Sequence, residues 1–390
     1  MNIPVKHCSS CGACANICAH GAISMQLDKD GFYRPVVDSS KCVKCGLCEK
    51  TCPWKNEVFN PNGNSKSPQT VAAYALNEEI RLHSSSGGVF TVLAEKILDD
   101  GGGVVGVAQL SSTRFGHIIV DNKDDLARLR GSKYVQANVG TVYRDVRALL
   151  KSGRKVLFSG TPCQVAGLYA TLGKKFFENL YTVDIVCHGT PSVKVFEKYI
   201  REQECANAAK ASFSLFRDKC KGWRDFSLTS FLKGSSENEI VCSKTLRNDK
   251  FMQLFMKNLS LSKSCSACHY ARLPRIADIS LGDYWNIAEV HPEMDDDKGT
   301  SVVLLNNGHG EKLFSIMTAG IKQCGSRIDF AVAGNPCIVR SSREHFRRVA
   351  FFADLDRMSL DALVKKYCIE LPLYKIMLLK IRNKLLRCFL

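Results

Sequence analysis

Two stretches decide the fold of the first part of the chain: CSSCGACANIC at residues 8–18 and CVKCGLCEKTCP at residues 42–53. Each carries four cysteines in the spacing C-x2-C-x2-C-x3-C, and a proline follows the second run. Gly12, Gly21 and Gly46 stand where the backbone must curl closely around the cysteines, which glycine does most easily. Ala19 replaces the proline that commonly closes such a run, which weakens a turn but removes no thiol.

This spacing is typical of bacterial ferredoxins, in which two cubane 4Fe-4S clusters exchange their fourth ligands between the runs. We therefore expect Cys52 to complete the first cluster and Cys18 to complete the second. Two structural zinc sites are an alternative, although zinc prefers C-x2-C pairs held well apart. A disulfide framework is another, but it belongs to small secreted domains. The eight expected ligands are Cys8, Cys11, Cys14, Cys18, Cys42, Cys45, Cys48 and Cys52.

Composition places the rest of the chain among ordinary globular proteins. The 390 residues are 45% hydrophobic and allow two or three domains. No secretory signal precedes the first cysteine run and no apolar run of about 18 residues occurs, so we expect no membrane span. Nineteen cysteines without a secretory context indicate a reducing compartment. We expect a cytoplasmic protein, with peripheral contact at the inner membrane face as an open alternative.

A net charge of +16 favours acidic partners. No aromatic-and-basic RNA signature or helix-turn-helix pattern stands out, so we expect no nucleic-acid partner. Beside iron–sulfur clusters, an acidic electron carrier such as ferredoxin or flavodoxin, or a partner oxidoreductase, is the expected partner, together with a small-molecule substrate.

The chain after the clusters alternates predicted strands and helices. Residues 57–70 are rich in Asn, Pro, Gly and Ser, which is typical of a linker. The expected fold is α/β (α+β overall): a ferredoxin-like dicluster domain, a mixed α/β flavin-binding domain and a helical tail. The expected domains are 1–60, 71–165, 166–330 and 331–390. Strands are expected at 71–76, 104–110, 155–158, 181–186, 276–285 and 301–305.

Four further cysteines form a candidate third cluster site. Cys163 and Cys187 each lie just beyond a predicted strand, beside the two Gly-Thr-Pro turns at 160–162 and 189–191. Ligands of open α/β sheets gather outside the carboxyl ends of strands. Cys265 and Cys268 form a C-x2-C pair. We therefore predict a third 4Fe-4S cluster on these four cysteines, with a zinc site or unrelated cysteines as the alternatives.

Several other features suggest weaker interpretations. Gly87 and Gly88 at a predicted helix start are suited to binding an anion, with a plain helix start as the alternative. The basic loop at 128–133 is suited to an anion as well, with a solvated loop as the alternative. Trp285 is a candidate for stacking on a cofactor ring, with packing in the hydrophobic core as the alternative. The acidic loop at 291–299 is expected to be solvated, and residues 371–390 form a basic helix for an anionic membrane or the protein body. The remaining cysteines are interpreted as small apolar residues: Cys205, Cys220, Cys242, Cys324, Cys337, Cys368 and Cys388.

The ordered motifs SSSGGVF, RGSKYVQ, FSGTPCQVAGL, DIVCHGTPS, FRDKCKGW, CSACHYA and DISLGDYW resemble the coenzyme F420 hydrogenase/dehydrogenase beta-subunit family. The resemblance covers residues 71–310, behind the dicluster domain. It implies FAD beside an iron–sulfur cluster held by the four core cysteines. It also indicates His188 as the best candidate for a proton donor, with a supporting structural role as the alternative. The implied flavin contacts are Ser86, Gly87, Gly88, Ser132, Lys133 and Tyr134.

The function implied is that of an iron–sulfur flavoprotein oxidoreductase. It would pass electrons between 4Fe-4S clusters and FAD, and so to or from an organic substrate or a deazaflavin coenzyme. The alternatives are a non-catalytic electron-transfer subunit of a partner enzyme and a cluster-containing assembly protein linked to surface polysaccharide synthesis.

Iron content tests the third cluster directly. Protein prepared without oxygen should contain roughly twelve iron atoms per chain by chemical analysis, because each cubane holds four. A content of roughly eight would mean that the four core cysteines hold no cluster.

Overall fold

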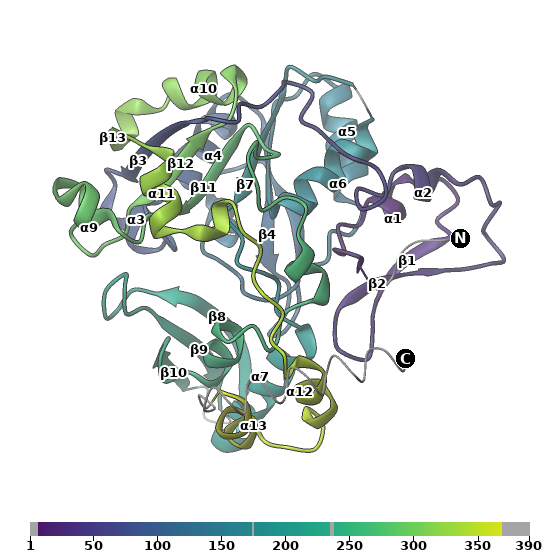
Figure 1. Cartoon of the computed structure of the whole chain (residues 1–390), viewed down its shortest axis with the longest axis vertical. Helices are drawn as coiled ribbons and strands as arrows, with labels where there is room; N and C mark the ends of the chain where they lie inside the picture. The colour runs from purple at the N-terminus through teal and green to yellow at the C-terminus, as the bar shows by residue number, and fades with distance from the viewer. Residues whose placement is uncertain (1–6, 174, 235–237, 369–390) are drawn as a thin grey trace.

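The computed structural model describes residues 7–173, 175–234 and 238–368, and a large mixed sheet runs through it (Figure 1). Its eight strands have the order β13-β3-β12-β11-β7-β6-β4-β5. The six strands expected from the sequence are all present, and β5 and β13 were not expected. The bounds are β3 Gln69–Ala75, β4 Gly103–Gln109, β5 Phe115–Val120, β6 Val156–Gly160, β7 Leu180–Ile185, β11 Ile279–Asp283, β12 Ser301–Leu305 and β13 Ile321–Ser326.

Helices cover both faces of this sheet because successive strand residues point to opposite sides. In β6, Leu157 packs with α4 and α10 on one face. Its neighbours Val156 and Phe158 pack with α5 and α6 on the other face. The central strands are buried on both sides, which explains their continuous apolar sequence and confirms the expected α/β class. The helices are α4 Val89–Asp99, α5 Val142–Lys151, α6 Pro162–Leu172 and α10 Gly308–Ser315.

The central strands β4, β6, β7 and β11 run parallel, so their carboxyl ends meet at one edge of the sheet. This edge carries Cys163 after β6, Cys187 after β7 and Asp283 at the end of β11. The boundary expected between residues 165 and 166 falls inside α6, and strands from both sides of it share the sheet.

A smaller lobe lies below the large sheet in Figure 1. Its three antiparallel strands are β8, β9 and β10, and helices α7, α8, α12 and α13 pack around an aromatic cluster with Phe196, Phe216 and Phe251. No strand was expected in this part of the chain. The bounds are α7 Val193–Asn207, β8 Lys210–Asp218, β9 Ser227–Lys233, β10 Glu239–Thr245, α8 Lys250–Met256, α12 Arg348–Asp354 and α13 Leu360–Tyr367.

The dicluster domain projects to the right in Figure 1 and docks on α5 through backbone carbonyl groups. The Tyr143 hydroxyl lies 2.8 Å from the Cys11 carbonyl oxygen. The Arg144 guanidinium donates at 2.7 Å to carbonyl oxygens at the end of α1, those of Ala15, Asn16 and Cys18. The first cysteine run is thus held against the large sheet's helices. The domain's elements are α1 Ala13–Ile17, β1 Ile23–Leu27, β2 Tyr33–Val37 and α2 Leu47–Lys50.

Residues 57–68 contain no helix or strand, yet the buried carboxylate of Asp278 fixes them to the core. Burial alone would raise the pKa of Asp278, but hydrogen bonds from His309, Asn307, Asn60 and Asn62 together lower it below its usual value. The carboxylate therefore joins the linker to the sheet as an anion. Its donors at 2.7–2.9 Å are the amides of Asn60, Asn62 and Asn307 and both the backbone N–H and the hydroxyl of Thr182.

The acidic loop at 291–299 differs from the solvated loop expected from its composition. Arg81 binds both carboxylate oxygens of Asp296, and Arg224 pairs with Asp295 at 2.9 Å and with Asp297 at 3.3 Å. Both arginines lie far away in the sequence, so the composition of the loop could not reveal them.

No helix within the described ranges is long and apolar enough to cross a membrane. The chain after residue 330 is helical at α11 (Ile328–Gly334), α12 and α13, as expected. The basic helix expected at 371–390 lies outside the described residues.

Replacing Asp278 should loosen the linker. Asp278→Ala leaves several buried donors without an acceptor, and we expect a loss of about 3–5 kcal/mol in stability. Limited proteolysis should then cut within residues 57–68 faster, and the thermal midpoint should fall. The exposed carboxylate of Asp121 is a matched control, and equal behaviour of Asp278→Ala and Asp121→Ala would contradict the role of Asp278.

His117 gives the fold a defined acid sensitivity. It stacks on Phe158, its ring nitrogens have no hydrogen-bond partner among the described residues, and burial lowers its pKa to about 4. The pKa of a histidine in the unfolded chain is about 6.5. The contribution of the neutral, buried ring to stability is therefore complete above that pH. It is lost as the pH falls toward 4, by up to about 3 kcal/mol. The variant His117→Phe should lose thermal stability less steeply than wild type between these pH values. Parallel curves would refute this.

Candidate functional site

Cys8, Cys11, Cys14 and Cys52 lie close enough in the dicluster domain for their thiols to influence one another. Burial raises the pKa of Cys11, and the neighbouring thiols of Cys8, Cys14 and Cys52 raise it further. Burial also raises the pKa of Cys14 to about 12, again with Cys8 and Cys52 contributing. Such mutual effects require the sulfurs to lie near one another. The structure therefore brings Cys52 to the first run, as the exchange of fourth ligands requires.

The other four cysteines of this domain lie closer to the surface. Cys45 is exposed, and Cys18, Cys42 and Cys48 are half-buried. Gly46 precedes α2 with φ of 74°, a left-handed conformation that glycine adopts without strain. Gly12 does the same before α1, with φ of 76°.

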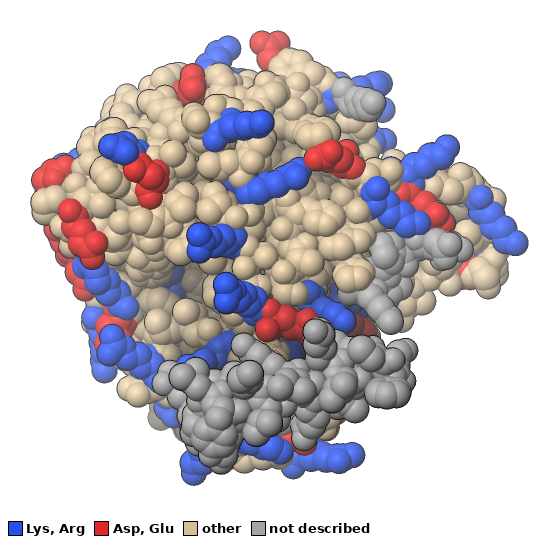
Figure 2. All heavy atoms as spheres, in the orientation of Figure 1, with Lys and Arg blue, Asp and Glu red and all other residues tan. Residues whose placement is uncertain are grey.

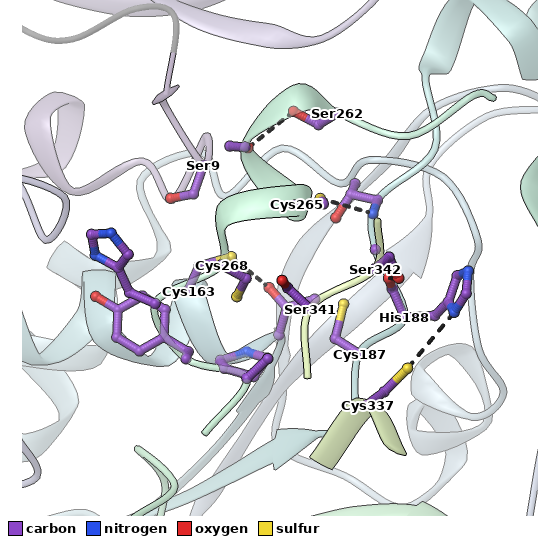
Figure 3. Close-up of a pocket in the computed structure, with 18 of the residues that line it drawn as sticks. Ser9, Cys163, Cys187, His188, Ser262, Cys265, Cys268, Cys337, Ser341 and Ser342 are labelled. Atoms are coloured by element: carbon purple, nitrogen blue, oxygen red, sulfur yellow. Dashed lines mark hydrogen bonds between the residues drawn. The ribbon is translucent and has the colours of Figure 1, made fainter. Parts of the chain in front are cut away.

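The four core cysteines converge on a cavity of 50 Å³ (Figure 3). Cys163 comes from the first turn of α6, Cys187 follows β7, and Cys265 and Cys268 lie around a short 3-10 helix at Lys263–Ala267. Burial raises the pKa of Cys187, and the thiols of Cys265, Cys163 and Cys268 raise it further. Three segments that are distant in sequence therefore place four sulfurs around one space.

The sulfurs of the predicted cysteine ligands are not gathered as closely as a single zinc ion requires. A tetrahedral zinc site needs its sulfurs about 3.8 Å apart, because each Zn–S bond is about 2.3 Å. All twelve predicted cysteine ligands lie within the described residues, and no three of their sulfurs are within 4.8 Å of one another.

A buried ion pair supports this small cavity. Arg275 Nη2 donates to Asp184 Oδ1 at 2.6 Å, and both side chains are at most 1% exposed. The same guanidinium donates to the carbonyl oxygens of Tyr270 and Ile338 at 3.2 Å. Arg275 therefore ties β7 to the loop that follows Cys268 and to the segment that carries Cys337.

A second cavity, of 610 Å³, lies between the carboxyl edge of the large sheet and the smaller lobe. The sheet side includes the start of α4 and the ends of β6, β7 and β11. The lobe side includes Arg217, Phe226 and Phe255.

Five of the six predicted flavin contacts line this cavity: Ser86, Gly88, Ser132, Lys133 and Tyr134. Lys133 folds back so that its Nζ donates to the carbonyl oxygens of Arg130 and Arg128, at 2.6 and 3.1 Å, and burial lowers its pKa to about 7. Gly87 is not part of the lining. A Cβ there would approach the Ala73 carbonyl oxygen to 2.5 Å, so this glycine permits close packing of the turn on β3.

The structure adds Arg217 to the cavity wall, a residue for which no role was expected, and it places Trp285 there as well. Arg217 donates to both carboxylate oxygens of Asp283, at 3.0 and 3.1 Å, and to the Tyr134 hydroxyl at 3.1 Å. Trp285 lines the cavity and also stacks on Trp223 with ring centres 4.8 Å apart. The motif FRDKCKGW already contained Arg217 and Trp223, but not their distant partners.

Three buried donors of the cavity wall have no hydrogen-bond partner among the described residues. They are Thr91 Oγ1, Arg130 Nε and Arg217 Nε. Buried polar groups are normally satisfied, so unpaired donors at a cavity indicate a polar or anionic ligand.

His188 lies on the wall between the two cavities. Its Nε2 is 2.7 Å from Asn258 Oδ1, and the Asn258 amide nitrogen donates to the Arg343 carbonyl oxygen at 3.0 Å. This fixes the amide orientation, so Nε2 carries the proton and Nδ1 faces the Cys337 thiol at 3.7 Å (Figure 3). Burial lowers the pKa of His188, which favours the neutral ring.

The two cavities share part of their walls. Thr161, Cys187–Thr190 and Cys337 line both. On its other side, the small cavity is lined by Ser9, Pro53 and Trp54 of the dicluster domain. The small cavity therefore lies between the dicluster domain and the large cavity.

Family profiles match three consecutive parts of the chain. A 4Fe-4S dicluster domain matches residues 7–56. The coenzyme F420 hydrogenase/dehydrogenase beta subunit N-terminal domain matches residues 70–144, and the C-terminal domain of the same subunit matches residues 153–324. The last two cover more than half of the chain, so it belongs to the coenzyme F420 hydrogenase/dehydrogenase beta subunit family and carries an iron–sulfur dicluster domain in front.

Two known proteins are similar to this chain. An uncharacterized protein of Methanocaldococcus jannaschii is 23% identical over 347 residues, covering 79% of this chain and 86% of that protein. The xenon-derivatized F420-reducing NiFe hydrogenase complex from Methanosarcina barkeri has a chain with a TM-score of 0.46 and 17% identity, covering 71% of this chain and 91% of that one.

Proposed function

We propose that the chain is an iron–sulfur flavoprotein oxidoreductase. Electrons would pass between an acidic carrier, three 4Fe-4S clusters and FAD, and so to or from an organic substrate or a deazaflavin coenzyme. The observation that carries the proposal is the shared wall at Cys187–Thr190, because it makes the four-cysteine cavity a neighbour of the large cavity. Single-electron transfer is the chemistry that 4Fe-4S clusters would supply on the twelve cysteines.

The large cavity fits FAD in size and in donors. Its volume of 610 Å³ lies within the range of about 300–1,000 Å³ for cofactor sites. Thr91 Oγ1 and Arg130 Nε are unpaired, and the start of α4 lines the same cavity. A helix N-terminus and a guanidinium together suit a pyrophosphate group. FAD, when bound, would exchange single electrons for hydride pairs.

Different residues of the chain would bind the cofactor, exclude water and transfer a proton. Gly88, Thr91 and Arg130 bind the anionic part of the cofactor, and Ser86, Ser132, Lys133 and Tyr134 line the same cavity. Arg217, held by Asp283, offers its free Nε–H to a polar ring atom or to the substrate. Phe226 and Phe255 exclude water. We propose His188 as a proton donor. Because Asn258 holds the Nε2–H, the ring would first take up a second proton at Nδ1 and then pass it to Cys337.

The surface around the exposed Cys45 is the proposed docking surface for the acidic carrier. Val43 and Leu47 beside it expose 58% and 46% of their surface, and Lys41, Lys44 and Lys50 are exposed around them. Figure 2 shows basic side chains on this projecting part of the molecule. An apolar centre with a basic rim suits a partner that is acidic, with association that weakens as salt rises.

A second candidate is an electron-transfer subunit that feeds a partner oxidoreductase. The family description as a beta subunit favours it. Turnover of a defined substrate by the purified single chain would separate the two candidates, because a feeding subunit needs its partner.

The test uses the full chain, prepared without oxygen. Its visible spectrum should show flavin bands on a broad iron–sulfur absorption, and acid extraction should release FAD. Arg130→Gln should weaken FAD binding about 10–100-fold, because a charge-assisted hydrogen bond is worth about 1.5–3 kcal/mol. The neighbouring exposed Arg128→Gln is the matched control and should retain FAD.

A second variant tests the route of the electrons. Cys187→Ala should keep FAD bound but abolish its rapid reduction by a reduced ferredoxin. An iron-loaded chain that binds no flavin would refute the proposal, as would normal flavin reduction in Cys187→Ala.

A further inference from the structure

A third group of metal-ligating side chains lies at the edge of the large sheet, away from the twelve cysteines. His291 follows α9 (Ile287–Val290), Glu293 lies in a 3-10 turn at Pro292–Met294, and Cys324 lies in β13. One ring nitrogen of His291, a carboxylate oxygen of Glu293 and Cys324 Sγ lie within 4.8 Å of one another. His291 Nδ1 is 3.5 Å from Glu293 Oε1.

The His291 ring is held in place from its other side. Its Nε2 lies 2.9 Å from Ser326 Oγ, which lies 2.6 Å from the Tyr284 hydroxyl. Ser326 and Cys324 are two residues apart in β13, so their side chains share one face of the strand. Metal-binding histidines commonly fix their orientation by such a hydrogen bond on the second nitrogen. Nδ1 is thereby directed toward Glu293.

We propose that His291, Glu293 and Cys324 bind Zn²⁺ and leave a fourth position open to water. Thiolate, imidazole and carboxylate are the three protein donors that zinc uses. A thiolate ligand disfavours Mg²⁺ and Ca²⁺, which prefer oxygen. Bonds of about 2.0–2.3 Å place the ligand atoms about 3.3–3.8 Å apart, so the group needs only a small closing movement.

The surroundings allow an ion to enter. The side chain of Glu293 is 60% exposed and that of His291 is 19% exposed, so the site opens to solvent on the glutamate side. Lys322 is the nearby cation, and its Nζ is engaged by the Glu293 carbonyl oxygen at 3.3 Å and by the Tyr74 ring. The Asp329 carboxylate is paired with Arg327 at 2.7 Å, so it adds little negative potential on this side.

Such an ion would anchor the acidic loop at 291–299 to β13. The far end of that loop is already fixed, because Lys219 Nζ donates at 2.7 Å to both the Lys298 and the Ser86 carbonyl oxygens. Ser86 lines the large cavity. The proposed zinc would thus stabilise a loop that supports the cavity wall. This inference does not depend on the proposed function.

The test measures zinc binding by the full, iron-loaded chain in competition with a chelating dye, without oxygen. Wild type should bind one Zn²⁺ per chain, and Cys324→Ser and His291→Gln should bind it at least about 100-fold more weakly. Glu293→Gln changes an exposed side chain and should fold normally while losing affinity. Ser326→Ala keeps all ligands and should weaken binding about tenfold. Cys205→Ser, at an exposed cysteine of α7, is the matched control and should equal wild type.

Zinc absorption spectroscopy on the loaded chain identifies the ligands. One sulfur at about 2.3 Å with nitrogen and oxygen at about 2.0–2.1 Å would support the site. Four sulfur ligands would place the zinc in the cysteine sites of the clusters and overturn the proposal. Equal zinc affinity in wild type, Cys324→Ser and Glu293→Gln, at unchanged iron content, would also overturn it.

Discussion

The buried ion pair between Arg275 and Asp184 is the interaction on which the central site depends. A buried ion pair is favourable only when its remaining donors are also satisfied. Arg275 meets this condition by binding the carbonyl oxygens of Tyr270 and Ile338 as well as the carboxylate. Asp184 lies three residues before Cys187 in the chain, and Arg275 follows Cys268 closely. The pair therefore fixes, relative to each other, the segments that supply three of the four core cysteines.

The segments around the four core cysteines place the dicluster domain, the small cavity and the large cavity in a row. Parallel strands bring Cys163 and Cys187 to one edge of the sheet, and the docked dicluster domain contributes Ser9, Pro53 and Trp54 to the other side of the small cavity. Tyr143, Arg144 and Asp278 hold that domain and its linker in place through carbonyl and amide groups. A fixed arrangement of this kind is what electron transfer between successive centres requires, because no centre has to move.

Local spacing in the sequence predicted the features that depend on local geometry. The cysteine runs, the strands that end before Cys163 and Cys187, and the glycine turns before α1 and α2 all follow from residues a few positions apart. Features that depend on distant partners could not be predicted. Arg217 meets Asp283 across 66 positions, and Arg81 meets Asp296 across 215. The strands of the smaller lobe were not predicted, and in β8 the apolar Phe213 and Leu215 are exposed while Ser214 is buried, so apolar character does not mark the buried face. Gly87 stays a predicted cofactor contact, and the space beside Ala73 leaves no room for a Cβ there.

The central claim is that a row of iron–sulfur sites ends beside the large cavity. Crystals grown without oxygen and measured at the iron absorption edge would locate the iron directly. The account predicts three separate iron peaks, two in the dicluster domain and one among Cys163, Cys187, Cys265 and Cys268. Only two iron peaks, both in the dicluster domain, with the four core cysteines ordered but without metal, would contradict the account.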